Sequence, residues 1–295
     1  MKKFISFLTV ALLISCGGQT EKDSEEASNA ANYDLAVAPD SWIEERVANA
    51  QERLNASPAG QKIWASIEAH GGLNTWFANG PVSFHFDYQP LEGGTRRNSF
   101  QVVDQWSVRT VQEVAANRAM KYGWDGENAW SFPDTANVGV NPRFWSNTPF
   151  YFVALPFVLA DEGVMLEELP AKEYKGVTYD LVKATYTDGT GDAPDDFYVI
   201  YIHPETKQMG GLRYIVSYPG FFPNGGNGPE KFMEILGVQT SNGITIPIGY
   251  NTYLFKENEV AEHITKIDVS EFGFKPDLKK DFFNAPEGAK IQEGL

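Results

Sequence analysis

The feature that most constrains this fold is a long series of short segments, from Val82 onward, in which apolar and polar residues alternate. A period of two is typical of a β-strand with one buried face, and tight-turn residues separate consecutive segments. The clearest turn is Asp125-Gly126, a type I′ hairpin signal between two aromatic-rich segments. Consecutive hairpins without crossover helices predict an antiparallel meander, because parallel neighbours need long connections. Such a sheet either closes on itself or curls around something.

About eleven strands are predicted from these segments and the turns between them. They cover residues 82–88, 95–103, 106–114, 118–124, 128–132, 174–186, 197–203, 212–218, 232–240, 244–255 and 260–269.

Two helices are predicted ahead of the sheet. Residues 40–54 are amphipathic, and Ser41 with Glu44 forms a capping box at the start of this helix. The second helix begins at Ser57, a favourable N-cap, and ends at the glycine pair that starts with Gly71. Both have an apolar side, so we expect them to pack against the curved sheet. The fold class is therefore mainly β with a few helices.

A long apolar segment, Pro133–Gly163, interrupts the strand pattern. Its ten residues Phe150–Leu159 are apolar apart from the hydroxyl of Tyr151, and Pro156 prevents an uninterrupted helix. The apolar run is too short to cross a membrane. Two interpretations remain open at this stage: a buried core helix or loop, or an apolar flap that covers the open side of the sheet and touches a ligand.

The first residues have the pattern of an export signal. Lys2 and Lys3 precede the apolar residues 4–14, and the sequence LISC, ending at Cys16, closes the segment. This resembles the lipobox of bacterial lipoproteins, which implies a signal peptide of residues 1–15 and a lipidated, palmitate-bearing Cys16. The alternative is an ordinary secretory signal with a chance cysteine. Cys16 is the only cysteine in the sequence, which excludes disulfides within the chain and thiolate metal sites.

The signal segment is followed by a predicted tether and one domain. Residues 16–39 contain mostly small and polar residues and read as a disordered tether. The acidic run between residues 21 and 26 loosely resembles export signals of surface lipoproteins, although a solvated linker explains it equally. Residues 40–295 are expected to form a single domain. We therefore expect the protein in the envelope of a diderm bacterium, anchored in the outer membrane on either its periplasmic or its surface side.

Charge and motifs exclude several classes of function. The formal net charge of −15 repels phosphate backbones, so nucleic acid is not an expected partner. The sequence lacks the motifs of serine hydrolases, zinc proteases, P-loop enzymes and dinucleotide-binding proteins, and its four histidines are widely spaced. The acidic turn 188–196 does not have the spacing of an EF-hand. We therefore expect no catalytic residue, no metal and no cofactor, and we interpret the protein as a non-enzyme.

Several stretches together resemble the LolA/LolB-like superfamily of periplasmic lipoprotein and lipid carriers, and most closely a set of larger bacterial lipoproteins of this type. They are the glycine pair before VSFHFDYQ, the hairpin KYGWDGENAW, the strand pair YVIYIHPETKQMGGLRYIV, and the closing ITKIDVSEFGF with FFNAPEGA. The resemblance implies an incomplete antiparallel β-barrel, a half-barrel wrapped over helices. It also implies a lipid-anchored protein that holds an acyl chain or another apolar ligand, with a role in lipid or lipoprotein trafficking.

The ligand would lie among aromatic and aliphatic side chains on the concave side of the half-barrel. The expected lining residues are Ile63, Trp64, Ile67, Phe84, Phe86, Trp124, Phe150, Phe152 and Phe157. Asp in place of Phe152 or Phe157 is expected to abolish ligand retention while leaving folding nearly intact. Two alternatives remain: a surface lipoprotein that binds or hydrolyses glycans, and a structural subunit with an envelope protein as its partner.

Overall fold

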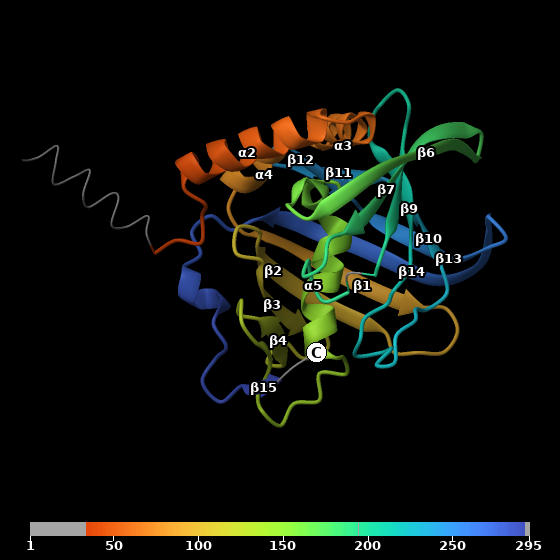
Figure 1. The fold of residues 1–295 in the computed structure, drawn as a ribbon. Helices are drawn as coiled ribbons and strands as arrows, with labels where there is room; N and C mark the ends of the chain where they lie inside the picture. Colours follow the sequence, from red (N-terminus) through yellow and green to blue (C-terminus); the bar gives the residue numbers. More distant parts are fainter. Residues whose placement is uncertain (1–33, 194, 293–295) are drawn as a thin grey trace, which may run out of the picture. The chain divides into compact units, whose positions relative to one another are not determined.

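A large antiparallel sheet dominates the computed structural model, which describes residues 34–193 and 195–292 (Figure 1). The predicted signal peptide, Cys16 and most of the tether lie outside the described residues. The strands are β1 (Val82–Pro90), β2 (Arg97–Asp104), β3 (Arg109–Val114), β4 (Lys121–Trp124), β5 (Ala129–Phe132), β6 (Val164–Tyr174), β7 (Val177–Tyr186), β8 (Tyr198–Ile202), β9 (Met209–Tyr214), β10 (Lys231–Ile235), β11 (Val238–Ser241), β12 (Ile244–Pro247), β13 (Gly249–Lys256), β14 (Glu259–Phe274) and β15 (Lys290–Gln292).

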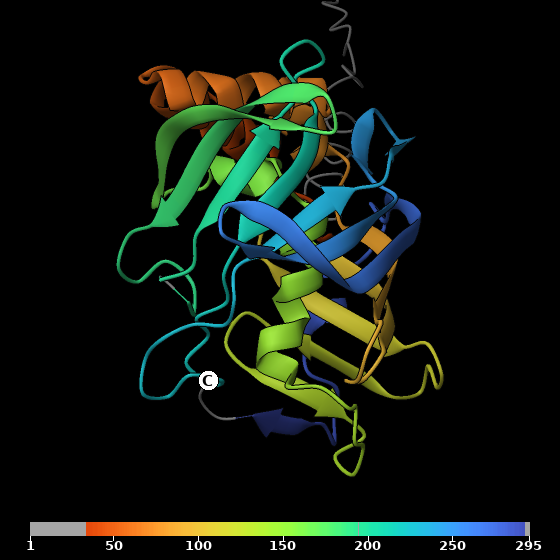
Figure 2. The same ribbon diagram turned by 90° about the vertical axis from the view of Figure 1, so that its right-hand side faces the viewer.

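Within the described residues, thirteen strands form one sheet in the order β15-β5-β4-β3-β2-β1-β14-β13-β10-β9-β8-β7-β6. All the pairings are antiparallel, and β1 pairs with β14 to join two meanders. The sheet does not close, because β15 and β6 are its two edges. The predicted mainly β half-barrel is thus confirmed: a large open sheet accompanied by helices (Figure 2).

Fifteen strands appear in the described chain where eleven were predicted. The missed strand β6 lies at an edge and carries Pro170 and a bulge between Leu169 and Lys172, so its apolar alternation is broken. The predicted strands 232–240 and 244–255 are each divided into two, β10 with β11 and β12 with β13, because the chain leaves the large sheet at Gly237 and returns at Gly249. Their φ angles of 149° and 158° are conformations that favour glycine. The short strand β15 was also not predicted, and it accounts for the remaining difference between eleven and fifteen strands.

The predicted hairpin between β4 and β5 is present, but its turn differs in type. Gly126 has a φ of 103°, whereas Asp125, the other central residue of the predicted turn, is not among the residues with positive φ, so the turn is not type I′. The Asp125 carboxylate accepts hydrogen bonds from the backbone amides of Glu127 and Asn128, at 2.9 and 2.7 Å. Asp125 therefore fixes the turn by its side chain.

Among the described residues, three helices precede the sheet: α2 (Asp40–Asn55), α3 (Pro58–Ala69) and α4 (Leu73–Ala78). The predicted cap of α3 is confirmed, since the Ser57 hydroxyl accepts from the amide of Gly60 at 3.0 Å. The predicted capping box of α2 is wrong, because Pro39 occupies the N-cap and no side chain caps this helix. Gly60 lets α2 and α3 meet closely, since a Cβ there would lie 2.0 Å from the Leu54 carbonyl oxygen.

The apolar segment forms helix α5 (Pro142–Val153) and a 3-10 turn, η1 (Phe157–Ala160), on the inner side of the curled sheet (Figures 1 and 2). Pro149 lies inside α5 and deprives the Trp145 carbonyl of its usual helical partner. The buried Gln112 of β3 replaces it, donating to the carbonyl oxygens of Trp145 and Ser146 at 2.7 and 2.8 Å. No helix of the described chain has the length and apolar character needed to cross a bilayer.

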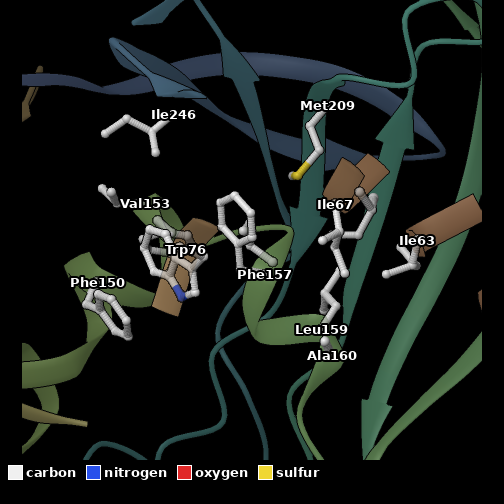
Figure 3. Close-up of a cluster of buried hydrophobic side chains, with 14 of the residues drawn as sticks. Ile63, Ile67, Trp76, Phe150, Val153, Phe157, Leu159, Ala160, Met209 and Ile246 are labelled. Atoms are coloured by element: carbon white, nitrogen blue, oxygen red, sulfur yellow. The ribbon is translucent and has the colours of Figure 1, made fainter. Parts of the chain in front are cut away.

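The main core lies between η1, the buried face of α5, the N-terminal helices and the sheet. At its centre, the rings of Trp76 and Phe157 are stacked with centroids 4.5 Å apart, and Phe150 lies beside them (Figure 3). Ile63 and Ile67 of α3 are fully buried in the same cluster. Most of the apolar segment is therefore integral to the core.

Candidate functional site

A cavity of about 660 Å³ extends along the less buried face of α5. This volume falls within the range of small-molecule sites in proteins. Its walls come from α2, α4, the β2–β3 turn, η1 and the loop between β7 and β8. The lining residues are Trp42, Arg46, Trp76, Phe77, Gln105, Trp106, Val108, Arg143, Phe144, Asn147, Thr148, Phe150, Tyr151, Phe152, Phe157, Val158, Asp161, Glu162, Val164, Tyr186, Thr190, Gly191, Asp192, Ala193, Asp196, Tyr198, Val216 and Tyr218.

Aromatic rings from α2, α4 and the β2–β3 turn form one part of the wall. Trp42 meets Phe77 edge-on with centroids 5.1 Å apart, and its ring lies 6.1 Å from that of Trp106. Trp42 and Trp106 are only partly buried, although both pack against the core. Large, half-covered aromatic surfaces of this kind can bury further apolar area when a ligand covers them.

A tyrosine cluster lies at another part of the wall. The hydroxyls of Tyr151 and Tyr186 are hydrogen-bonded to each other, and the ring of Tyr198 lies 4.9 Å from that of Tyr151. Burial is the main cause that raises the pKa of all three phenols above the ordinary value. The three therefore stay protonated at neutral pH and offer hydroxyl groups, not charges.

Two arginines of the lining are held by carboxylates. Arg46 of α2 pairs with Asp161, just after η1. Arg143 pairs with Asp192 at 2.6 Å, and its guanidinium lies 3.6 Å from the ring centroid of Trp124. Because each guanidinium already has a carboxylate partner, the two ion pairs fasten α2 to η1 and α5 to the β7–β8 loop.

Asp196 is a further carboxylate of the lining. It accepts hydrogen bonds from the backbone amide and the hydroxyl of Ser217, at 2.6 and 2.7 Å. Burial raises the pKa of Asp196, and the two bonds from Ser217 oppose this shift. The positive charge of Lys231 also opposes the shift by lowering the pKa of Asp196.

Three of the nine predicted ligand-binding residues reach the cavity: Phe150, Phe152 and Phe157. All three are also buried in the core, with at most 8% of their surface exposed. The expected effect of Asp at Phe152 or Phe157 is therefore corrected. An unpaired carboxylate at either position would be buried, which destabilises the fold itself.

The other six predicted residues do not line the cavity. Four of them are buried in the core: Ile63, Ile67, Phe84 and Phe86. Trp64 is partly buried and packs against the core. Trp124 lies beneath Arg143, where it supports the ion pair with Asp192. None of these six residues therefore belongs to the wall of this cavity.

Sequence reasoning missed the residues that converge from distant loops. Trp42 and Trp106 lie beside a helix start and in a turn, where an aromatic ring has little reason to be buried. Tyr186 and Tyr198 border the β7–β8 loop on its two sides. Large aromatic residues at the ends of helices and strands were the signal that could have indicated a cavity wall. Which of these residues contact one another depends on the tertiary fold.

The structure gives the histidine His70 a structural position. Its Nδ1 lies 2.9 Å from the Thr245 carbonyl oxygen, and its Nε2 accepts from the backbone amide of Met209 at 3.2 Å. Across residues 34–193 and 195–292, no three His, Cys, Asp or Glu side chains are grouped so that they could hold a metal ion.

No protein-family model matches the sequence, and no curated protein matches it either. Several solved structures, however, are similar to this chain in fold. A LolA superfamily protein from Nitrosomonas europaea aligns with 77% of this chain and 97% of its own, at 10% identity and a TM-score of 0.51. A DUF1329 family protein from Desulfovibrio piger aligns over 77% and 98%, at 10% identity and a TM-score of 0.49. The open sheet with helices on its inner side is thus similar in fold to the LolA superfamily protein.

Proposed function

We propose that this protein is a lipid-anchored binding protein of the bacterial envelope, which holds an acyl chain or another apolar ligand along α5. One observation carries the proposal: a cavity of about 660 Å³ has a mostly aromatic and aliphatic wall. A soluble domain rarely keeps such an apolar surface uncovered without a use for it. The similarity of fold to a LolA superfamily protein supports the same conclusion.

Binding would follow from burial of the ligand. Each methylene group removed from water contributes about 0.8 kcal/mol, so affinity would rise with chain length until the cavity is filled. The rings of Trp42, Trp106 and Phe144 are partly buried and would supply the contact area. The protein would hold or carry the ligand without changing it chemically.

The membrane location rests on the sequence. The proposed anchor is an acylated, palmitate-bearing Cys16, followed by a tether of residues 16–39 and a single domain from residue 40 to residue 295. We propose the outer membrane of a diderm bacterium as the location, because the acidic run between residues 21 and 26 follows the lipobox-like start. Lipid or lipoprotein trafficking is the process we propose, and an envelope protein would be its second partner.

The glycan alternative has less support. Glycosidase chemistry needs two carboxyl groups that face each other across a cleft. Of the four carboxylates in the cavity lining, Asp161 and Asp192 are each paired with an arginine, and Asp196 accepts two hydrogen bonds from Ser217, which leaves Glu162 without a second free carboxyl group. The observations therefore favour an apolar ligand.

Native mass spectrometry with lipid extraction tests the proposal. The full chain would be purified from its own host, as wild type and as Val158→Trp, which fills the cavity from η1. Leu236→Trp is the matched control, because Leu236 is exposed at 42% and lies outside the cavity wall. We expect a lipid to co-purify with the wild type and the control, and to be lost from Val158→Trp. A wild type that is empty and takes up no lipid on soaking would contradict the proposal.

A further inference from the structure

The tyrosine cluster of the cavity wall brings three phenols together from α5, β7 and β8. Ala184 of β7 pairs with Tyr198 of β8, and Tyr186 lies two residues further along β7, so both tyrosines point to the same face of the sheet. Tyr151 of α5 lies over them, with its ring 4.9 Å from that of Tyr198. The rings of Tyr186 and Tyr198 are 6.3 Å apart. All three tyrosines line the cavity.

The hydroxyls of the tyrosine cluster have donor hydrogens that the described chain does not use. Between Tyr151 and Tyr186 one hydroxyl donates and the other accepts, so the hydrogen of the accepting hydroxyl stays free. The Tyr198 hydroxyl has no hydrogen-bond partner among the described residues, although Tyr198 is only 9% exposed. This hydroxyl is also not one of the unpartnered polar atoms that protein atoms cover completely. Because Tyr198 lines the cavity, a ligand there can reach its hydroxyl.

The charges around the tyrosine cluster disfavour an ionised acid as its partner. Both arginines of the described wall are already paired with carboxylates. The negative charge of Asp196 acts on Tyr186 and Tyr198, where it adds to the rise of the pKa that burial causes. Lys231 acts on Asp196 but does not belong to the lining. An ionised carboxylate of a ligand would therefore lose its hydration without meeting a free cation of the wall, which is costly.

From this geometry we infer that the tyrosine cluster is the polar subsite of the cavity, and that it binds the uncharged carbonyl of an acyl ester. The inference rests on the proposed function and adds the class of ligand. A carbonyl oxygen has two lone pairs, so it can accept hydrogen bonds from two hydroxyl groups. An ester presents this acceptor without carrying a charge into the cavity, whereas a free fatty acid is ionised at neutral pH. The acyl chain then lies against the aromatic wall.

Three probes with the same twelve-carbon chain separate the carbonyl from apolar burial: methyl laurate, laurate and dodecane. Binding to the full chain is followed by intrinsic tryptophan fluorescence at neutral pH. We expect methyl laurate to bind more tightly than laurate. Tyr198→Phe removes one hydroxyl and keeps the ring, so it should weaken methyl laurate binding on the order of tenfold and leave dodecane binding unchanged. Tyr253→Phe is the matched control, because Tyr253 is a partly buried tyrosine outside the wall.

Infrared spectroscopy of the bound ester tests the hydrogen bonds themselves. Methyl laurate with a ¹³C-labelled carbonyl should show its stretching band at a lower wavenumber in the wild-type protein than in a hydrocarbon solvent. In Tyr198→Phe the band should move back towards the hydrocarbon position, and in Tyr253→Phe it should stay where it is in the wild type.

Three results would overturn the inference and leave the proposed function intact. They are a band at the hydrocarbon position in the wild type, equal losses of ester and dodecane binding in Tyr198→Phe, and laurate binding at least as tight as that of the ester. If none of the three probes binds, the proposed function fails as well.

Discussion

The two faces of helix α5 differ in how closely they are packed. One face, which includes Trp145, Pro149 and Val153, is buried against the sheet and the core. The other presents Phe144, Asn147, Thr148 and Tyr151 to the cavity. The buried face is closely packed, whereas the cavity face mixes aromatic rings with amides and hydroxyls that are only partly covered. Under the proposed function, one face of the helix stabilises the fold and the other binds the ligand, and substitutions should separate these two roles.

The largest loss of stability should follow from Trp145→Ala on the buried face. The ring of Trp145 lies 5.4 Å from that of Tyr88, and the Arg97 guanidinium lies 4.5 Å from its centroid. Removal of a buried Trp costs about 3–5 kcal/mol of the free energy of unfolding. Urea denaturation measures this quantity. A loss below about 1 kcal/mol would show that this face is not part of the core.

Next in size is His70→Gln, which tests the only histidine that the described core contains. A glutamine amide can replace only one of the two ring contacts of His70, to the Met209 amide or to the Thr245 carbonyl, and loss of the other costs about 1–3 kcal/mol at neutral pH. Burial lowers the pKa of His70. The unfolded chain therefore takes up this proton first, and stability falls as the pH drops below about 6.5 until it passes the folded-state pKa.

The variant should lose that part of the pH dependence. Urea denaturation between neutral and mildly acidic pH, compared with the wild type, gives the difference. His203→Gln, at an exposed turn, is a suitable control for loss of a histidine. An identical pH dependence in wild type and His70→Gln would contradict the role given to His70.

A smaller effect is expected at the edge between the two faces, from Arg143→Ala. The Arg143 side chain is exposed by 15% and its partner Asp192 by 26%, so solvent screens the pair only in part. Loss of the pair and of the contact with Trp124 should cost about 1–2 kcal/mol in urea denaturation. Asp192→Asn keeps the contact with Trp124 and should cost less. Equal losses in both variants would assign the whole effect to the ion pair.

The smallest effect on stability should come from Thr148→Val on the cavity face. Its hydroxyl donates to the Phe144 carbonyl oxygen of the same helix, and the substitution conserves volume. We expect the free energy of unfolding to change by less than about 0.5 kcal/mol. Binding of dodecanol, followed by tryptophan fluorescence, should nevertheless become tighter, because a methyl group replaces the hydroxyl in the cavity wall. A large loss of stability without a change in binding would reverse the roles of the two faces.

The half-barrel could be predicted because its signals are local. Alternation from Val82 and the hairpin at Asp125 specify strands and turns within a few residues of each other. The edge strand β6 was missed for the same reason, since an edge strand with Pro170 carries little alternation.

The cavity could not be predicted in the same way. Ile63 and Phe84 have the apolar character expected of a lining, yet they fill the core. Trp42, Trp106 and Tyr186 come from parts of the chain far apart in sequence and meet only in the folded protein. A single sequence reports that a residue is apolar, but it does not report which neighbour covers it.

The measurement that tests the central claim most directly is photolabelling of the full chain with a long-chain alcohol that carries a diazirine, followed by peptide mass spectrometry. We expect labels on α5, η1 and the β2–β3 turn, at residues such as Tyr151, Val158 and Trp106, and their loss when dodecanol competes. Labels confined to the exposed apolar residues Leu236, Val238 and Ile248, or labels insensitive to competition, would contradict it.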